Sequence, residues 1–429
     1  MSTVTTTEQT ASASAPPHLG IGDRLRLWWS AQRRPVQWAI GVPFILLLAA
    51  LPILRPPLLT TVGTDFGGVL AQFGMYALLA IGLNVVVGQT GLLDLGYVGF
   101  YAIGAYTVGL MTSPDSPWNL TGGWLSRPSA WFFAVPVAIA ITAVSGLILG
   151  TPTLRLRGDY LAIVTLGFGE IVRLMADNLD TITGGGRGLS QIAFPVMGVS
   201  EARPNGVFSA GNTVQPFNFG VWWYWVSLLL IIVVLLVVGN LERSRVGRAW
   251  VAIREDEDAA EIMGVPTFKF KLWAFLIGAS IGGLSGALYA GQVQFVVPTT
   301  FNVINSMLFL CAVVLGGQGN KLGVILGAFI IVYLPNFFLG RTELLGIPIN
   351  GDEIAKFKYL FFGLALVVLM IFRPQGLFPA RQKLLTYSRE VYAAARKAAL
   401  TMGAHVGHVG HGGPAGPAEP VEPTTGGAP

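Results

Sequence analysis

Long apolar runs recur along this chain, and they constrain its fold more than any other feature of the sequence. A helix needs roughly 20 consecutive apolar residues to cross the hydrocarbon core of a bilayer. Hydrophobic residues make up 53% of the 429 residues and charged residues only 11%, whereas a soluble domain carries about 25% charged residues. Backbone inside lipid must satisfy its own hydrogen bonds, which favours helices. The chain is therefore predicted to be an all-α, polytopic membrane protein.

About ten apolar runs approach the length of a membrane-spanning helix. The fifth and eighth runs are short and rich in Gly, so some of the predicted helices are expected to be short or broken. The predicted spans are residues 36–54, 67–88, 92–111, 131–150, 160–176, 219–240, 270–291, 303–318, 322–340 and 356–372.

The distribution of basic residues predicts how the chain is oriented, because Lys and Arg collect in cytoplasmic loops. If the N-terminal segment is cytoplasmic and the spans alternate, the external loops 112–130, 177–218 and 341–355 hold few basic residues. This agreement predicts an even number of spans with both termini in the cytoplasm. The basic residues on the predicted cytoplasmic side include Arg24, Arg26, Arg33, Arg34, Arg155, Arg157, Arg243, Arg245, Arg248, Arg254, Lys321, Arg373, Arg381 and Lys383.

Three regions are predicted along the chain. Residues 1–35 form a cytoplasmic N-terminal segment with an interfacial stretch of Arg and Trp, and residues 36–380 form the transmembrane domain. This domain contains a polar cytoplasmic loop, 241–270, and a long external loop, 177–218. Residues 381–429 form a cytoplasmic tail of Gly, Pro and Ala that cannot bury enough apolar surface to fold, so it is expected to be largely disordered.

Cysteine and histidine usage predicts no metal site. Cys311 is the single cysteine, so a disulfide within the chain is impossible and a Cys-based metal site is not expected. His405, His408 and His411 recur at every third position of the tail. Their Gly spacers argue against a preformed transition-metal site there.

The stretch REDEDAAEIMG, residues 254–264, is a compact polar interruption between two long apolar runs. Acidic residues at its start suit a helix N-terminus, and Gly264 followed by Pro266 is placed to end the helix. The pattern predicts one short helix that projects from the cytoplasmic face. Because so short a helix is unstable alone in water, it should pack against something. The alternative is an ordinary amphipathic loop helix.

This stretch resembles the coupling loop of bacterial ABC importer permeases. Asp258, Ala259 and Ala260, then three residues, then Gly264, are similar to the family's E-A-A-x-x-x-G pattern, with Asp258 in place of the usual Glu. The downstream part of the loop departs from the fuller pattern. In that family the loop docks in a cleft of a cytoplasmic ATPase, whose closure reorients the membrane helices. The resemblance implies this role for Arg254, Asp258, Ala259, Ala260, Glu261 and Gly264.

The resemblance extends over about residues 36–380. Five segments resemble branched-chain amino acid permeases, more closely the LivM-type subunit: GQTGLLDLGYVGFYAIGAY (88–106), LRLRGDYLAIVTLGFGEIVR (154–173), ITGGGRG (182–188), VGRAWVAIREDEDAAEIMGV (246–265) and IFRPQGLFP (371–379).

This resemblance implies that the chain is a permease subunit in the bacterial cytoplasmic membrane and imports branched-chain or other apolar amino acids by alternating access. The implied partners are a LivH-type permease, two cytoplasmic ATPase subunits and an extracytoplasmic substrate-binding protein, besides membrane lipid. ATP and Mg²⁺ would bind the ATPases, and no cofactor would bind this chain. No nucleic-acid partner is implied.

No catalytic constellation is evident, so the chain is not predicted to be an enzyme. GGQGNKLG, residues 316–323, superficially resembles a phosphate-binding loop. Asn320 replaces the Gly that should precede the Lys, and no Ser or Thr follows Lys321. The stretch is predicted to be a tight cytoplasmic turn between two spans.

A cluster of polar residues in the second and third predicted spans suggests the transport path. Asn84, Gln89, Thr90, Tyr97 and Tyr101 flank a predicted helix break at 88–91. Lipid tolerates broken backbone only where protein or water covers it. These residues are therefore candidates for lining or gating the translocation pathway.

Glu170 is a further candidate for the pathway, because ionisable groups inside a membrane are costly and often functional. It lies three residues before Arg173, so the two can also form an ion pair along one helix. Gly278, Gly282 and Gly286 recur at every fourth position, which puts them on one helical ridge and predicts close packing against another helix.

Several alternatives remain open at this stage. Urea or short-amide ABC importers have closely related permeases, and no residue separates them from amino acid importers. An ion-coupled secondary transporter needs buried acids, and only Glu170 fits that role. A non-transporting membrane scaffold conflicts with the broken polar helix. The external loop 177–218 is either a simple connector or a docking surface for a substrate-delivery protein.

Overall fold

The computed structural model describes residues 34–56, 59–61, 64–121, 127–156, 158–200, 204–344, 347–348, 350–372 and 376–378. The chain divides into two units, residues 1–380 and 381–429. The tail with its three histidines, and the N-terminal segment before Arg34, lie outside the described residues.

Each of the predicted apolar runs forms a helix. These helices are α2 (Arg34–Leu54), α3 (Phe66–Leu83) continued by the π-helix η1 (Asn84–Gln89), α4 (Val98–Thr112), α5 (Arg127–Thr153), α6 (Asp159–Asn178), α8 (Phe219–Arg243), α11 (Thr267–Val293), α12 (Val303–Gly316), α13 (Lys321–Phe338) and α15 (Lys358–Phe372).

Short elements form part of the connections between these helices. They are α7 (Asp180–Thr183), the 3₁₀ helix η2 (Gly185–Arg187), α9 (Arg245–Glu255), α10 (Glu257–Ile262), the 3₁₀ helix η3 (Pro298–Phe301), β1 (Glu343–Leu344), β2 (Ile347–Pro348) and α14 (Gly351–Lys356). The two strands pair antiparallel, with Glu343 opposite Pro348. Apart from this small hairpin, the described elements are helical, so the all-α prediction is confirmed.

Helix length and composition bear on the number of membrane crossings. Within the described residues, 5 helices are both long and apolar enough to cross a bilayer. Four more are apolar but only 10–17 residues long, and a helix of 15 residues spans ~22 Å of a hydrocarbon core that is about 30 Å thick. Helix α6 has 20 residues but carries several charged side chains. The figure of about ten spans therefore stays a prediction.

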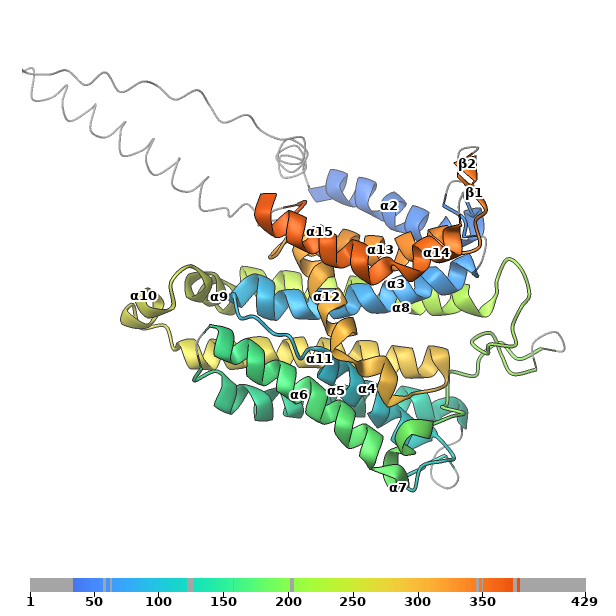
Figure 1. The fold of residues 1–429 in the computed structure, drawn as a ribbon, viewed down its shortest axis with the longest axis horizontal. Helices are drawn as coiled ribbons and strands as arrows, with labels where there is room; N and C mark the ends of the chain where they lie inside the picture. Colours follow the sequence, from blue (N-terminus) through green and yellow to red (C-terminus); the bar gives the residue numbers. More distant parts are fainter. Residues whose placement is uncertain are drawn as a thin grey trace, which may run out of the picture. The chain divides into compact units, whose positions relative to one another are not determined.

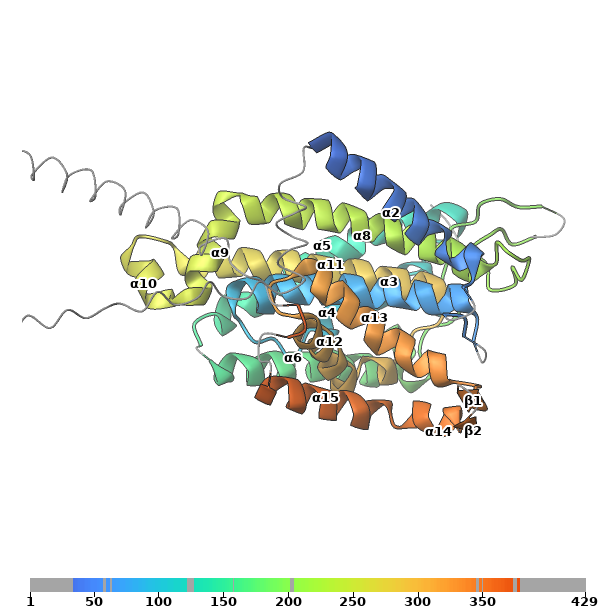
Figure 2. The same ribbon diagram turned by 90° about the horizontal axis from the view of Figure 1, so that it is seen from above.

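Within residues 1–380, the longer helices run side by side, with the polar elements gathered at their ends. Figure 1 shows α9 and α10 at one end of α3, α8 and α11, and the β1–β2 hairpin at the opposite end. Seen from above, α2 lies outside α8 on one side, and α15 lies on the other side (Figure 2). Helix α11 packs against α3, α4 and α5 and forms the centre of the bundle.

Small residues allow α11 to lie very close to its neighbours. A Cβ atom on Gly286 would lie 2.2 Å from the carbonyl oxygen of Tyr101, and a Cβ atom on Gly278 would lie 2.6 Å from a methyl group of Val86. A Cβ atom on Gly282 would lie 3.1 Å from the Cβ atom of Phe100 and 3.3 Å from the ring of Tyr97. In lipid, helix association depends on such van der Waals contact, because apolar residues gain little by leaving the lipid tails.

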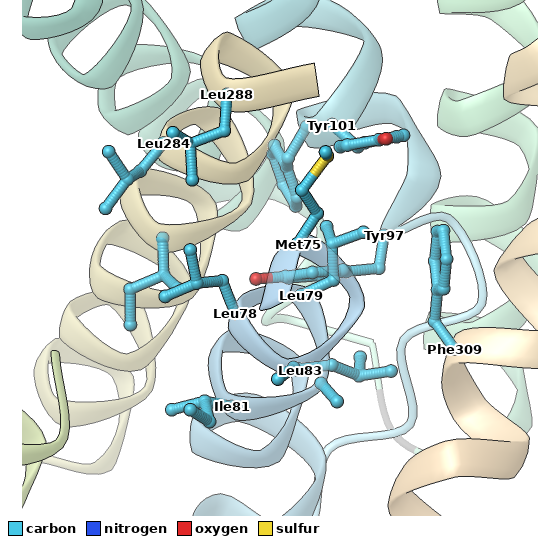
Figure 3. Close-up of a cluster of buried hydrophobic side chains, with 14 of the residues drawn as sticks. Met75, Leu78, Leu79, Ile81, Leu83, Tyr97, Tyr101, Leu284, Leu288 and Phe309 are labelled. Carbon is cyan, nitrogen blue, oxygen red and sulfur yellow. The ribbon is translucent and has the colours of Figure 1, made fainter. Parts of the chain in front are cut away.

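Larger side chains fill the space around this close contact. Figure 3 shows side chains of α3, α4, α11 and α12 in one buried cluster, with Tyr101 of α4 and Phe309 of α12 near Met75 of α3. The ring centroids of Tyr101 and Phe309 lie 5.9 Å apart in an edge-to-face arrangement, a geometry that aromatic pairs prefer. The labelled members are Met75, Leu78, Leu79, Ile81, Leu83, Tyr97, Tyr101, Leu284, Leu288 and Phe309.

The predicted helix break after the second apolar run is confirmed. The π-helix that leads into the break was not predicted from the sequence. The α-helix of α3 widens into η1 at Asn84 and ends at Gln89. Gly91 then takes a positive φ of 73°, which glycine adopts readily. The Oδ1 atom of Asp94 accepts a hydrogen bond from the backbone N–H of Gly96 at 2.9 Å and stabilises the following turn. Helix α4 therefore begins at Val98, later than the predicted residue 92.

Candidate functional site

The polar stretch 254–264 folds as parts of two helices instead of one. Helix α9 ends at Glu255, and Asp256 takes an extended backbone conformation with φ −157°. Its Oδ1 atom accepts a hydrogen bond from the N–H of Ala259 at 3.0 Å and so caps α10. The prediction of one helix is therefore wrong. The short carboxylate side chain of Asp256 caps the start of α10, and its extended backbone ends α9.

The end of α10 agrees with the prediction for Gly264. The N–H of Gly264 donates to the carbonyl of Glu261 at 2.9 Å, and the N–H of Val265 donates to that of Ala260 at 3.0 Å. This pair of bonds is a Schellman motif, which requires a left-handed residue after the helix. Gly264 has φ +84°. Of the described atoms, none lies within 4 Å of the place where its Cβ would be, so the backbone conformation alone selects glycine.

Contacts with α11 anchor the α9–α10 loop to the bundle. The fully buried Trp250 of α9 donates its indole N–H to the carbonyl of Phe270 at 2.8 Å. The ammonium of Lys271, whose side chain is 2% exposed, pairs with the carboxylate of Glu257 in α10. A buried charge needs such a partner. Part of the packing that this short helix requires therefore comes from the chain itself.

The tip of the loop remains exposed and is partly apolar. Ile262 and Met263 are 86% and 82% exposed, and they follow directly after the exposed Glu261. Ala259 is also exposed, whereas Ala260 is buried. Sequence reasoning missed Ile262 and Met263, although two adjacent apolar residues before the terminating glycine of a polar loop were a visible signal. An exposed apolar pair rimmed by acidic residues suits a protein contact.

The α9–α10 loop is also bonded to the break at the end of α3. The Nη1 atom of Arg254, in the last turn of α9, donates to the carbonyl oxygen of Gly88 in η1. The side chain of Arg254 also lies against Gly91, whose Cβ would be 3.2 Å from the arginine Cγ. Arg254 thus connects the end of α9 directly to the broken segment of α3.

A second set of polar contacts joins three helix ends at the same place. Glu242, near the end of α8, accepts a hydrogen bond from Gln89 Nε2 at 2.5 Å and pairs with Lys321 Nζ at 2.6 Å. Asn84 Oδ1 accepts from the N–H of Gly319 at 2.8 Å, in the turn between α12 and α13. We call the set Asn84, Gln89, Glu242, Arg254 and Lys321 the junction.

The GGQGNKLG stretch is the turn that the sequence predicted. Helix α12 ends at Gly316 and α13 begins at Lys321. Gly317 and Gly319 both have positive φ, 107° and 81°. These values let the chain reverse direction within a few residues.

A cavity of about 470 Å³ lies at the other end of α3, remote from the junction. Its described walls come from the first half of α3 and the residues before it, from Tyr101 of α4, the last turns of α11, η3, the first half of α12 and the end of α13. Among the described lining residues, Asp65 is the one charged side chain, and the others are amides, hydroxyls, aromatic rings and aliphatic groups. The lining residues are Thr64, Asp65, Gly68, Val69, Gln72, Met75, Tyr76, Tyr101, Tyr289, Gln292, Val293, Thr300, Asn305, Phe309 and Asn336.

The structure separates the residues that the sequence grouped as a possible pathway. Tyr101 is the member of that group among the described lining residues of the cavity. Asn84 and Gln89 belong to the junction, and the Thr90 hydroxyl donates to the carbonyl of Val86 within its own helix.

Tyr97 and Glu170 also lie away from the described lining of the cavity. Tyr97 is fully buried and donates its hydroxyl to the carbonyl of Gly278 at 2.7 Å. Glu170 pairs with Arg173 on the partly exposed face of α6, with 3.0 Å between Arg173 Nε and Glu170 Oε1. The ion-pair alternative for Glu170 is thus confirmed.

Sequence reasoning missed most of the residues that line the cavity. Gln72 and Gln292 are amides inside or at the end of apolar runs, which is a weak signal on its own. Gln72 and Gln292 are 220 positions apart in the sequence. No local pattern predicts that they line the same cavity.

The loop 177–218, predicted to be external, contains α7 and η2 and is bonded to the chain after α11. Leu189 and Val296 form an antiparallel bridge, with backbone hydrogen bonds of 2.9 and 3.0 Å. The N–H and hydroxyl of Ser190 both donate to the carboxylate of Asp115. The described part of this loop is therefore an ordered surface at the end of the bundle that holds the cavity.

Comparisons with known proteins agree on one family. A family model described as the branched-chain amino acid transport system / permease component matches residues 66–370. The high-affinity branched-chain amino acid transport system permease protein LivM of Escherichia coli is 41% identical over 313 residues, which cover 71% of this chain and 68% of that protein. No solved structure matches the chain.

More distant relatives include both kinds of permease protein. The probable branched-chain amino acid transport permease protein LivM of Methanocaldococcus jannaschii is 25% identical over 342 residues, covering 73% of this chain and 93% of that protein. The permease protein LivH of Escherichia coli is 26% identical over 309 residues, covering 70% of this chain and 90% of that protein.

Proposed function

This chain belongs to the family of branched-chain amino acid transport permease components, and from that membership we propose that it is one of two membrane-spanning subunits of an ATP-driven importer of branched-chain amino acids. It is a multi-pass membrane protein of the LivM type. It moves its solute across the membrane and does not alter it chemically.

The α9–α10 loop supports the coupling part of this proposal. The loop carries the family-like residues Asp258, Ala259, Ala260 and Gly264, and its exposed apolar tip suits a partner surface. In the proposed complex this tip docks on a cytoplasmic ATPase, which binds ATP and Mg²⁺. The Schellman motif at Gly264 holds the tip in the conformation that the ATPase recognises.

Two connections in the chain would carry the movement of the ATPase into the membrane. The Glu257–Lys271 ion pair joins α10 to α11, and the Arg254–Gly88 bond joins α9 to η1. Because both α11 and α3 contribute walls to the cavity at the opposite end, a shift of either helix changes that cavity. This is a physical route for alternating access, in which the ATPase biases a two-state membrane unit.

The remaining partners follow from the relatives. Proteins named LivM and LivH both match this chain, which supports a pair of related permease subunits. We assign two ATPase subunits to the cytoplasmic α9–α10 side and a substrate-binding protein to the external loop 177–218. The positive-inside distribution supports cytoplasmic termini.

The alternatives receive less support. The relatives are named as branched-chain amino acid permeases, which does not favour urea or amides as the solute. The acid that the sequence offered for an ion-coupled transporter, Glu170, is paired with Arg173 on the partly exposed face of α6. Neither that class nor a passive scaffold explains a capped, anchored loop with an exposed apolar tip.

Uptake of labelled leucine, valine and urea tests the proposal in cells with and without this chain. Selective loss of leucine and valine uptake is expected. Loss of urea uptake alone would move the assignment to the amide importers. Copurification of the chain under gentle conditions tests the class separately, because absence of ATPase subunits would contradict the ABC mechanism.

A further inference from the structure

We propose that the cavity at the Thr64 end of α3 is a binding site, within the membrane subunit itself, for a zwitterionic amino acid with an apolar side chain. The inference rests on the proposed function and adds the place and chemistry of solute recognition. The cavity volume of about 470 Å³ falls within the range of small-molecule sites, about 300–1,000 Å³. Helices α3, α4, α11, α12 and α13 contribute to its described walls, so movement of any one of them alters the site.

Two buried polar atoms of the cavity lining lack hydrogen-bond partners among the described residues. They are Thr64 Oγ1 and Gln292 Oε1. A buried donor or acceptor without a partner costs free energy, and native proteins contain few of them. The hydroxyl can donate and accept, and the amide oxygen accepts. Both atoms are thus available to a polar solute that enters the cavity.

The charge of the lining selects the class of solute. Asp65 is the one charged residue among the described lining residues. One of its oxygens accepts from the N–H of Gly68 at 2.8 Å, and the other accepts from Asn218 Nδ2 at 2.6 Å. A carboxylate has about four acceptor sites, so it can still accept from an ammonium group. A lining with one negative charge and no described basic side chain disfavours a purely anionic solute.

Neutral donors are available for a carboxylate group on the same solute. Gln72 contributes a side-chain amide, and Tyr76 and Tyr101 contribute hydroxyls. Asn305 and Asn336 each donate one amide N–H to a backbone carbonyl, of Thr300 and Val332 respectively, which leaves the second N–H of each amide for the solute. Aromatic faces also attract an ammonium group. The described lining therefore offers partners for both ends of a zwitterion without requiring a net charge.

The rest of the wall is apolar and suits an aliphatic side chain. Val69, Met75, Val293 and Phe309 line the cavity, and the Phe309 ring lies edge-to-face with Tyr76 at a centroid distance of 5.1 Å. Figure 3 shows Met75, Tyr101 and Phe309 in one group. Urea would leave both this apolar wall and the Asp65 charge without a matching group.

A cysteine-protection experiment tests the site in the full transporter. Gln292→Cys is assembled with the partner subunits in proteoliposomes without the binding protein, and a membrane-impermeant maleimide is added outside. Native Cys311 is 3% exposed, so its background labelling should be low. Leucine at ten times its dissociation constant is expected to slow labelling of Gln292→Cys about tenfold, by simple occupancy.

The matched control is Gly211→Cys in the external loop. Gly211 is exposed and has room for a Cβ, whose nearest described neighbour would be 3.7 Å away. It should label at the same rate with and without leucine. Equal labelling of Gln292→Cys with and without leucine would overturn the proposal, as would protection by urea in place of leucine.

A charge substitution tests the recognition of the ammonium group. Asp65→Asn removes the charge but keeps a good N-cap for α3, and it should weaken leucine binding about tenfold through the lost charge-assisted bond. Thr64→Val is a second variant, expected to weaken binding about threefold. The control is Thr107→Val, whose hydroxyl bonds the carbonyl of Ile103 within α4, away from the described lining.

The outcomes separate this inference from the proposed function. If the wild-type complex imports leucine but Asp65→Asn and Thr64→Val bind leucine as tightly as Thr107→Val does, the cavity is not the site and the function stands. If the wild-type complex neither binds ATPases nor imports leucine, the proposed function fails first.

Discussion

The exposed tip of the α9–α10 loop allows a quantitative test of ATPase docking. We predict that replacing both Ile262 and Met263 by Ser separates the permease from the proposed ATPase subunits without unfolding the permease. The two side chains are 86% and 82% exposed, so the permease alone gains almost nothing from them. Nearly all of their apolar surface is available to a partner.

The magnitude of the effect follows from that exposure. Full burial of one such side chain contributes about 1.5–3 kcal/mol. Ordering the two side chains at an interface offsets part of this gain. If about half of the gain from both side chains is realised, the double substitution costs about 1.5–3 kcal/mol, which is about 10- to 150-fold in affinity.

The test measures the affinity of purified ATPase subunits for the permease in nanodiscs. The thermal midpoint of unfolding of the permease is recorded in parallel. The matched control is Ile371→Ser with Phe372→Ser at the end of α15, an adjacent apolar pair that is 69% and 77% exposed. Both pairs lie on the predicted cytoplasmic side. Wild-type affinity in the loop variant, or equal losses in both variants, would refute docking through this tip.

Three further substitutions test the loop and the bundle. Gly264→Val forces a β-branched residue to φ +84°, a strain of about 1–3 kcal/mol; ATP hydrolysis should continue while leucine uptake falls, and normally coupled uptake would count against the docking role. Glu257→Gln leaves the charge of Lys271 without its ion-pair partner; because the Glu257 side chain is 30% exposed, we expect a loss of about 1–3 kcal/mol, below that of a fully buried pair, seen as a lower thermal midpoint in detergent. An unchanged midpoint would show that this pair does not stabilise the loop. Gly286→Leu places a Cβ 2.2 Å from a backbone oxygen of α4 and should reduce the folded fraction in size-exclusion chromatography, whereas Gly363→Leu, whose Cβ meets no described atom within 4 Å, should be tolerated.

The sequence alone determined the fold class, the approximate positions of the helices and several of their ends. The length and apolar composition of a run restrict its structure in lipid to a few possibilities. The runs that form α3, α8 and α11 could therefore be recognised in the sequence as membrane helices. Glycine at positive φ is a local requirement, which is why the end of α10 at Gly264 and the turn before Lys321 were predictable. The family resemblance rested on contiguous motifs that need no tertiary information.

Local pattern was insufficient where two backbone conformations compete within a few residues. The stretch around Asp256 has good helix formers on both sides, yet its side chain caps a new helix. The same limitation applies to Asn84, where α3 widens into a π-helix. The side-chain amide oxygen of Asn84 accepts a hydrogen bond from the N–H of Gly319, which is distant in the sequence. These outcomes depend on contacts that form only when α9, η1 and the α12–α13 turn meet.

The tertiary structure alone decided which polar residues share a site. Asn84 and Gln89 belong to the junction. Glu170 forms an ion pair on α6. Tyr101 lines the cavity together with Gln292 and Asp65. In a membrane protein, hydropathy is similar for a side chain that faces lipid and one that faces another helix, because both surroundings are apolar. Only the packing of α3, α4, α11, α12 and α13 distinguishes a wall of the cavity from a buried contact.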